Sequence, residues 1–190
     1  MYTKSTLKRI ITMKIMIASD IHGSYKYAKM LTDRFNESGC EKLLLLGDIL
    51  YHGPRNDLPE EYAPKKVISL LNPLKNKILA VRGNCDTEVD QMVLDFPILA
   101  DYAVVYSGKK TIYATHGHKY SPQNPPPLAE GDILINGHTH VTKYEEYENF
   151  TYINPGSVSI PKEDTKRGYI ILEGGTFSFY DIEGNLTEKH

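Results

Sequence analysis

The stretch Leu43-Leu44-Leu45-Leu46-Gly47-Asp48 decides the fold. Four consecutive leucines do not alternate with polar residues, so they predict a short strand that is buried on both faces. Gly47 ends the strand, and Asp48 places a carboxylate at its carboxyl end. Because ligands bind at this edge of open α/β sheets, Asp48 is the first candidate site residue.

The same pattern recurs along the chain. One apolar strand leads into Asp20-Ile21-His22, and another leads into Gly83-Asn84. Later strands precede His116-Gly117-His118 and His138-Thr139-His140. The first three strands are expected to deliver oxygen and imidazole groups to one edge of a sheet, and the later strands add further histidines.

Length and composition are typical of one globular α/β domain. The chain has 190 residues, of which 41% are hydrophobic and 24% charged. We expect residues 1–12 to be an N-terminal extension and residues 13–190 to be a single domain. Cys40 and Cys85 are too few for a disulfide framework, and no stretch has the length of a signal peptide core or a membrane span, so a cytoplasmic location is expected.

The order of elements predicts two packed sheets. Strands over residues 14–19, 43–46 and 77–81 alternate with helices over residues 24–36 and 64–71, which requires a parallel sheet. Mostly antiparallel strands follow, at residues 102–106, 110–114, 132–135, 141–147, 151–153, 168–172 and 176–181. We therefore expect an α/β fold in which two mixed sheets, flanked by helices, pack as a four-layer α/β/β/α sandwich.

The polar residues at the strand ends are typical of a metal site. Aspartate, asparagine and histidine without thiolates suit ions such as Mn²⁺, Fe²⁺, Co²⁺, Ni²⁺ or Zn²⁺. Seven candidate ligands are too many for one ion but enough for two, if one carboxylate bridges. They are Asp20, His22, Asp48, Asn84, His116, His138 and His140. Paired ions about 3.5–4 Å apart are typical of phosphate-ester hydrolases.

This ordered set resembles the calcineurin-like metallophosphoesterases over residues 13–161. Residues 20–24, 52–56, 82–86 and 154–157 are similar to the small bacterial YfcE-type phosphodiesterases. The resemblance implies one ion held by Asp20, His22, Asp48 and His140. It implies a second ion held by Asp48, Asn84, His116 and His138, so that Asp48 bridges. Mn²⁺ is the expected metal, with Zn²⁺, Fe²⁺, Ni²⁺ and Co²⁺ as alternatives.

The resemblance also implies a reaction and a substrate class. A hydroxide bridging the ions would attack a small phosphate diester. A phosphomonoesterase using the same site is the nearest alternative, and a non-catalytic, protein-binding scaffold of the same fold is an alternative of another class. The net charge of −2 gives no electrostatic reason to expect nucleic acid or a membrane as a partner. A homo-oligomer, either a dimer or a tetramer, is expected from related small phosphodiesterases.

Arg55 is the predicted clamp for the substrate phosphate. Its planar guanidinium could hold a non-bridging oxygen from the long loop after the leucine strand. The alternative is a surface arginine paired with Asp57 or Glu60.

The sequence leaves alternative roles open for His118, Cys85 and Asp86. His118 could assist the leaving group or support His116, or could simply pack against Tyr120. Cys85 stands where many relatives have a histidine that protonates the leaving group, and a thiol is a poorer acid. We therefore expect a substrate with a good leaving group, or one assisted by water or by His118. Asp86 could hold a ligand histidine or cap the helix that follows.

Overall fold

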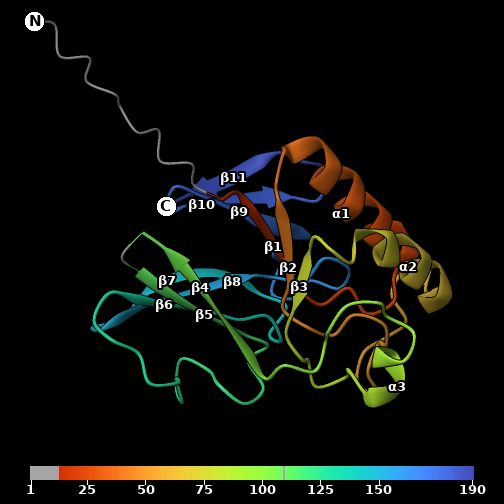
Figure 1. Ribbon diagram of the computed structural model, residues 1–190, viewed down its shortest axis with the longest axis horizontal. Coiled ribbons are helices and arrows are strands. Elements are labelled where there is room, and N and C mark those ends of the chain that lie inside the picture. The colour runs from red at the N-terminus through yellow and green to blue at the C-terminus, as the bar shows by residue number, and fades with distance from the viewer. Residues whose placement is uncertain (1–12, 109) are drawn as a thin grey trace, which may run out of the picture.

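Two packed sheets form the centre of the protein (Figure 1). The computed structural model describes residues 13–108 and 110–190, so the expected extension over residues 1–12 lies outside the described residues. The six-stranded sheet has the order β11-β10-β9-β1-β2-β3, and the five-stranded sheet has the order β4-β5-β6-β8-β7. The predicted pair of mixed sheets is therefore confirmed.

The elements follow one another closely along the chain. The six-stranded sheet consists of β1 (Ile15–Ala18), β2 (Lys42–Leu45), β3 (Ile78–Ala80), β9 (Gly168–Glu173), β10 (Thr176–Asp181) and β11 (Leu186–Lys189). The five-stranded sheet consists of β4 (Tyr102–Ser107), β5 (Lys110–Thr115), β6 (Asp132–Ile135), β7 (Thr142–Glu146) and β8 (Phe150–Pro155). The helices are α1 (Tyr25–Ser38), α2 (Pro64–Leu71), the short 3₁₀ helix η1 (Asn72–Leu74) and α3 (Glu88–Gln91).

The leucine run is the shared centre of two hydrophobic cores. Leu43 and Leu45 pack with the helices, whereas Leu44 and Leu46 pack with the five-stranded sheet. All four side chains are at most 1% exposed, as predicted for a strand buried on both faces. Burial of a leucine side chain contributes roughly 1.5–3 kcal/mol, so this strand stabilises both layers.

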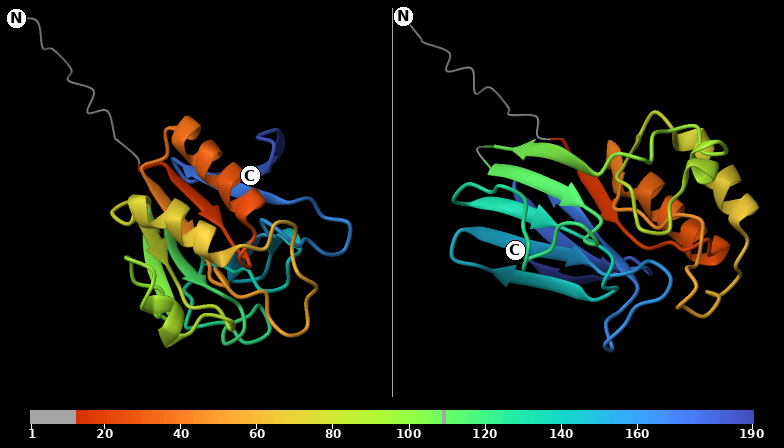
Figure 2. Two further views of the ribbon diagram at one scale, coloured as in Figure 1. Left: turned by 90° about the vertical axis from the view of Figure 1, so that its right-hand side faces the viewer. Right: turned by 90° about the horizontal axis from the view of Figure 1, so that it is seen from below.

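The helices begin and end where the sequence signals indicate. The Ser24 hydroxyl accepts a hydrogen bond from the Tyr27 amide (3.4 Å) and caps α1, and Gly39 ends that helix with a φ of 71°. Pro64 is the first residue of α2, where its missing N–H costs nothing. Figure 2 shows α1 and α2 on one side of the paired sheets. Within the described residues, the outer face of the five-stranded sheet carries no comparable helix layer.

Strand direction decides where the strand ends meet. β1, β2 and β3 are parallel, and β9 joins β1 antiparallel. The second half of the chain pairs mostly antiparallel, as predicted, but β5, β6 and β8 are parallel neighbours. The carboxyl ends of β5 and β6 therefore lie at one edge, beside those of β1, β2 and β3.

No helix in the described part of the chain is long and apolar enough to cross a membrane.

Candidate metal centre

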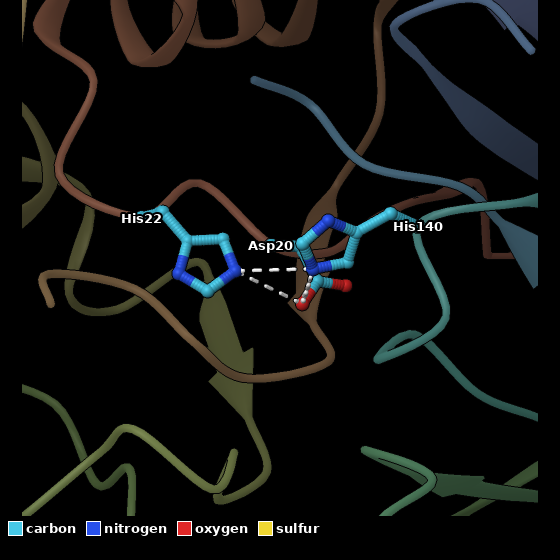
Figure 3. Close-up of side chains that lie close together, drawn as sticks. All are labelled: Asp20, His22 and His140. Carbon is cyan, nitrogen blue, oxygen red and sulfur yellow. Dashed lines mark hydrogen bonds and ion pairs between the residues drawn. The ribbon is translucent and has the colours of Figure 1, made fainter. Parts of the chain in front are cut away.

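The seven predicted ligands lie together at the carboxyl ends of five strands. Asp20 and His22 follow β1, and Asp48 follows β2. Asn84 follows β3, His116 follows β5, and His138 and His140 follow β6. Figure 3 shows the part of this cluster formed by Asp20, His22 and His140, whose polar atoms point toward one another.

Five of these seven residues have a left-handed backbone conformation. The φ angles are 58° at Asp20, 48° at His22, 54° at Asp48, 67° at His138 and 62° at His140. For residues other than glycine this conformation costs about 1–2 kcal/mol each. Strain of this kind persists where surrounding contacts fix the backbone, and it concentrates at functional sites.

Asp20, His22 and His140 form the first group of ligand atoms. The Nε2 atoms of His22 and His140 are 3.2 Å apart, and Oδ1 of Asp20 lies 3.5 Å and 3.2 Å from them. The Nδ1–H of His22 donates to the carbonyl of Tyr51, and that of His140 donates to the carbonyl of Ile160, both at 2.8 Å. These bonds leave each Nε2 free to present a lone pair, as in metal-bound histidines.

His116, His138 and Asn84 form the second group. The Nε2 of His116 lies 3.0 Å from Oδ1 of Asn84 and 3.2 Å from Nδ1 of His138. The Nδ1–H of His116 donates to the Leu46 carbonyl at 2.7 Å, so its Nε2 also faces the cluster. The leucine strand thus supplies both Asp48 and the carbonyl that orients His116.

Asp48 lies between the two groups. Its Oδ2 is 3.7 Å from the Nε2 of His22 and 3.5 Å from the Nε2 of His116. Its Oδ1 accepts a hydrogen bond from the Cys85 amide at 2.8 Å. One carboxylate oxygen therefore faces both groups, which is the placement a bridging ligand requires.

The charges of this cluster fit bound cations. Oδ1 of Asp20 is buried and has no hydrogen-bond partner, and two imidazole nitrogens converge beside it. Burial opposes ionisation of Asp20, but the facing His140 and His22 outweigh it and hold its pKa well below the usual range. Burial likewise lowers the pKa of His116, but Asp48 and Asp20 raise it to about 9. A positive charge is favoured here, and a divalent cation would supply it.

Asp86 has a role that neither sequence interpretation described. Its buried carboxylate accepts hydrogen bonds from the amides of Asp48 (2.8 Å), Ile49 (2.9 Å) and Gly83 (2.8 Å). Thr87, rather than Asp86, caps α3. Burial raises the pKa of Asp86. Asp86 therefore ties the turn after β2 to the turn after β3 and fixes Asp48 in its strained conformation.

Glycine is required where these two turns meet. A side chain on Gly47 would collide with the backbone of Gly83, and one on Gly83 would collide with Asp48. Gly47 also has a φ of 95°, which favours glycine. Glycine at this position therefore allows the two turns to approach each other.

The loops after β6 and β8 are fastened to the same cluster. The side-chain amide of Asn154 donates to the backbone carbonyl of Gly137 at 2.8 Å, and the Ser157 hydroxyl donates to the backbone carbonyl of Asp20 at 2.8 Å. The amide of His138 donates to Oδ2 of Asp20 at 2.9 Å. The sequence indicated that residues 154–157 were a motif, and the structure assigns them this supporting role.

A pocket of about 350 Å³ opens over the cluster. Its lining residues are Asp48, Gly53, Pro54, Arg55, Asn56, Asn84, Cys85, His138, Thr139 and Lys162. Arg55 thus lies at the predicted place, and among the described residues it forms no ion pair with Asp57 or Glu60. Glu60 instead pairs with Lys26 at 2.6 Å. Sequence reasoning missed Lys162, because no motif surrounds it.

His118 lies beside the predicted ligands, whereas the sulfur of Cys85 lies within 4.8 Å of ligand atoms of His22 and Asp48. The His118 ring is exposed, 5.4 Å from that of His116, and its aromatic neighbours among the described residues are His116 and His138 rather than Tyr120. It makes no hydrogen bond to His116 within the described structure. Burial and the Asp48 carboxylate raise the pKa of Cys85 well above its usual range, so its side chain stays a neutral thiol.

Comparisons with known proteins agree with this fold and site. Residues 13–176 match the calcineurin-like phosphoesterase superfamily domain. Phosphodiesterase YfcE of Escherichia coli is 48% identical over 166 residues, which cover 87% of this chain and 90% of that protein. Its structure, described as a phosphoesterase, superposes with a TM-score of 0.90 at 45% identity, over 94% of this chain and 98% of that one.

A more distant structure shares the fold alone. Vacuolar protein sorting 29 from Cryptosporidium parvum has a TM-score of 0.61 at 17% identity, covering 94% of this chain and 98% of that chain.

The two mixed sheets, with aspartates and histidines collected at their edges, define the class of metal-dependent phosphoesterases. Within that class, this chain belongs to the calcineurin-like phosphoesterase superfamily.

Proposed function

We propose that this protein is a metal-dependent phosphodiesterase that hydrolyses a small phosphate diester. The observation that carries the proposal is the position of Asp48, whose Oδ2 lies between the imidazoles of His22 and His116 at the floor of an open pocket. The 48% identity to a bacterial protein named as a phosphodiesterase supports the choice of a diester over a monoester.

We assign the ligands as the resemblance implied. Asp20, His22, Asp48 and His140 would hold one ion, and Asp48, Asn84, His116 and His138 would hold the other. Mn²⁺ is the proposed metal, because the ligand set combines imidazole nitrogen with carboxylate and amide oxygen. When bound, two such ions attract an anionic ester and lower the pKa of bound water toward about 7.

The other pocket residues would bind and orient the ester. The Arg55 guanidinium can donate two parallel hydrogen bonds to a phosphate, which fixes the orientation of the ester. His118 lies exposed beside His116, where it could assist the departing oxygen. Asp86 is a positioning residue, since it acts only by holding the backbone of Asp48.

The proposed function predicts metal-dependent hydrolysis with a preference for diesters. Protein stripped of metal and resupplied with Mn²⁺ is expected to hydrolyse bis(4-nitrophenyl) phosphate faster than 4-nitrophenyl phosphate, as followed by nitrophenolate release. Bound metal is measured on the same samples. Faster hydrolysis of the monoester would favour a phosphomonoesterase. A folded, metal-loaded protein that cleaves neither ester would point to a non-catalytic scaffold.

Cys85→His is expected to extend activity toward poor leaving groups. An imidazole at the pocket floor can donate a proton that the neutral thiol retains, and positioned acids contribute about 10²–10⁴-fold. We expect methyl 4-nitrophenyl phosphate, which has a good leaving group, to be cleaved at a similar rate by both proteins. Dialkyl phosphates should be cleaved faster by the variant. Equal rates for both proteins on both esters would count against this explanation for the cysteine.

We also propose a cytoplasmic, homo-oligomeric protein in which residues 13–190 form one domain. Two free cysteines support a reducing compartment. Pairing of β9 with β1 supports a single domain, because it joins the C-terminal strands to the first one.

Exposed Tyr102 and Tyr106 on the edge strand β4 support association between copies, as a dimer or a tetramer. With a net charge of −2, a small ester is favoured over nucleic acid as the substrate.

A further inference from the structure

Two cationic side chains contribute to the lining of the pocket over the metal-ligand cluster. Arg55 belongs to the loop between β2 and α2, and Lys162 belongs to the loop between β8 and β9. These loops, gold and blue in Figure 2, lie on the same side of the molecule in both views. Among the described residues, Asp48 supplies the only carboxylate in the pocket lining.

The backbone of Lys162 is fastened to the cluster. Its amide donates a hydrogen bond to the carbonyl of His140 at 3.0 Å. The carbonyl of Lys162 accepts hydrogen bonds from the amide (3.0 Å) and the hydroxyl (2.8 Å) of Thr165. This exposed lysine therefore starts from a fixed position beside a candidate metal ligand, whatever rotamer its side chain adopts.

The turn after Lys162 is strained. Glu163 and Asp164 have φ angles of 52° and 58°, a pair of values that a type I′ turn requires and that glycine or asparagine usually provides. Among the described residues, neither of these acids forms an ion pair with Lys162. Because Lys162 lines the pocket and is not paired with these acids, its ammonium group is available to a ligand there.

The positive charge of the site exceeds what a simple diester requires. The scissile phosphate of a diester carries one negative charge. Two divalent cations would outweigh the charges of Asp20 and Asp48, and Arg55 lines the pocket in which that phosphate would bind. The additional charge of Lys162 would therefore act on a different group of the substrate.

We propose that Lys162 binds a second anionic group of the substrate, so that the physiological diester carries a further phosphate or carboxylate. This inference rests on the proposed phosphodiesterase function. Lys162 is here a specificity-determining residue: it contacts the part of the substrate that is not cleaved. The contribution of Lys162 to substrate binding should fall as ionic strength rises, because its side chain is exposed.

Three diesters with the same 4-nitrophenyl leaving group test the proposal. They are the 4-nitrophenyl ester of thymidine 5′-phosphate, the same compound with a 3′-phosphate, and 4-nitrophenyl phosphorylcholine, whose other arm is cationic. The wild-type protein loaded with Mn²⁺ is expected to prefer the 3′-phosphorylated ester. Lys162→Gln should lower kcat/KM for that ester about tenfold, mainly through KM, and change the other two less than about threefold. Lys162→Arg should retain the preference.

Lys166→Gln is the matched control, since Lys166 is an exposed lysine of the same loop that lies outside this pocket. It should leave all three rates unchanged. Calorimetry with thymidine 3′,5′-bisphosphate and thymidine 5′-phosphate measures binding without turnover. Lys162→Gln should weaken the binding of the bisphosphate and leave the binding of the monophosphate unchanged. An anionic ester carrying a carboxylate in place of the 3′-phosphate separates the two chemistries.

The outcomes distinguish this inference from the function it rests on. Equal losses on all three esters would overturn it, because the lysine would then act on the scissile phosphate or on the loop itself. Wild-type hydrolysis of the plain diester without any preference for the anionic ester would also overturn it, while leaving the phosphodiesterase intact. Hydrolysis of none of the esters would remove the proposed function, and this inference with it.

Discussion

Asp48→Asn is expected to abolish metal-dependent diester hydrolysis. The substitution keeps the size of the side chain but removes the charge of the oxygen that faces both His22 and His116. Loss of a group that merely supports a metal ligand costs about 10–100-fold, so loss of the bridging carboxylate should reduce kcat/KM by more than about a hundredfold. Metal content, measured by elemental analysis, should fall below that of the wild type.

Stability distinguishes loss of the site from loss of the fold. Burial opposes ionisation of Asp48, but the facing His116 outweighs it and lowers the pKa of Asp48, so this charge stabilises the metal-free protein. The metal-free Asp48→Asn variant should therefore still unfold cooperatively, but at a moderately lower temperature than the metal-free wild type. Addition of Mn²⁺ should stabilise the wild type and leave the variant unchanged. Asp95→Asn, an exposed aspartate paired with Lys75, is the control and should behave as wild type. Full activity and metal binding in Asp48→Asn would contradict the ligand assignment.

Asp86→Ala is expected to destabilise the protein strongly and to lower its activity. The substitution leaves the amides of Asp48, Ile49 and Gly83 without their acceptor in a buried site. Each orphaned buried donor costs about 1–3 kcal/mol, and partial relaxation should bring the total to about 3–5 kcal/mol. For a chain of this size the unfolding temperature should fall by about 6–20 °C, measured by calorimetry.

Asp86→Asn gives a graded comparison for the same position. The amide keeps one acceptor oxygen and places an N–H₂ group against a backbone donor, so both stability and activity should lie between those of the wild type and the alanine variant. Because Asp86 positions Asp48 without touching the substrate, its variants should lose kcat and metal affinity more than KM. An alanine variant with an unchanged unfolding temperature and full activity would show that this carboxylate does not hold the two turns.

Local sequence patterns were enough to predict the sheets and the ligand set. A run of four leucines predicts burial on two faces wherever it stands, and the structure places Leu43 and Leu45 toward the helices and Leu44 and Leu46 toward the second sheet. Asp20, Asp48 and Asn84 each lie within four residues of the end of a strand, so strand direction alone predicts that they share an edge. Ser24, Gly39 and Pro64 likewise mark helix boundaries through their own backbone and side-chain chemistry.

The tertiary structure decided what depends on contacts between distant segments. Asp86 contacts Asp48 across 38 residues of sequence, and no local pattern reveals which backbone amides a buried carboxylate will accept. Lys162 lines the pocket in a loop that is hydrogen-bonded to the carbonyl of His140, a contact between distant segments.

The sequence also did not reveal that β5, β6 and β8 pair in parallel. The β propensity of Tyr, Val, Ile and Thr does not distinguish parallel from antiparallel pairing. The sequence by itself therefore determined which residues are candidate metal ligands, because the chemistry of a ligand belongs to its side chain. Only the tertiary structure determined how these ligands are held and what charge surrounds them, because those properties arise between segments that the fold brings together.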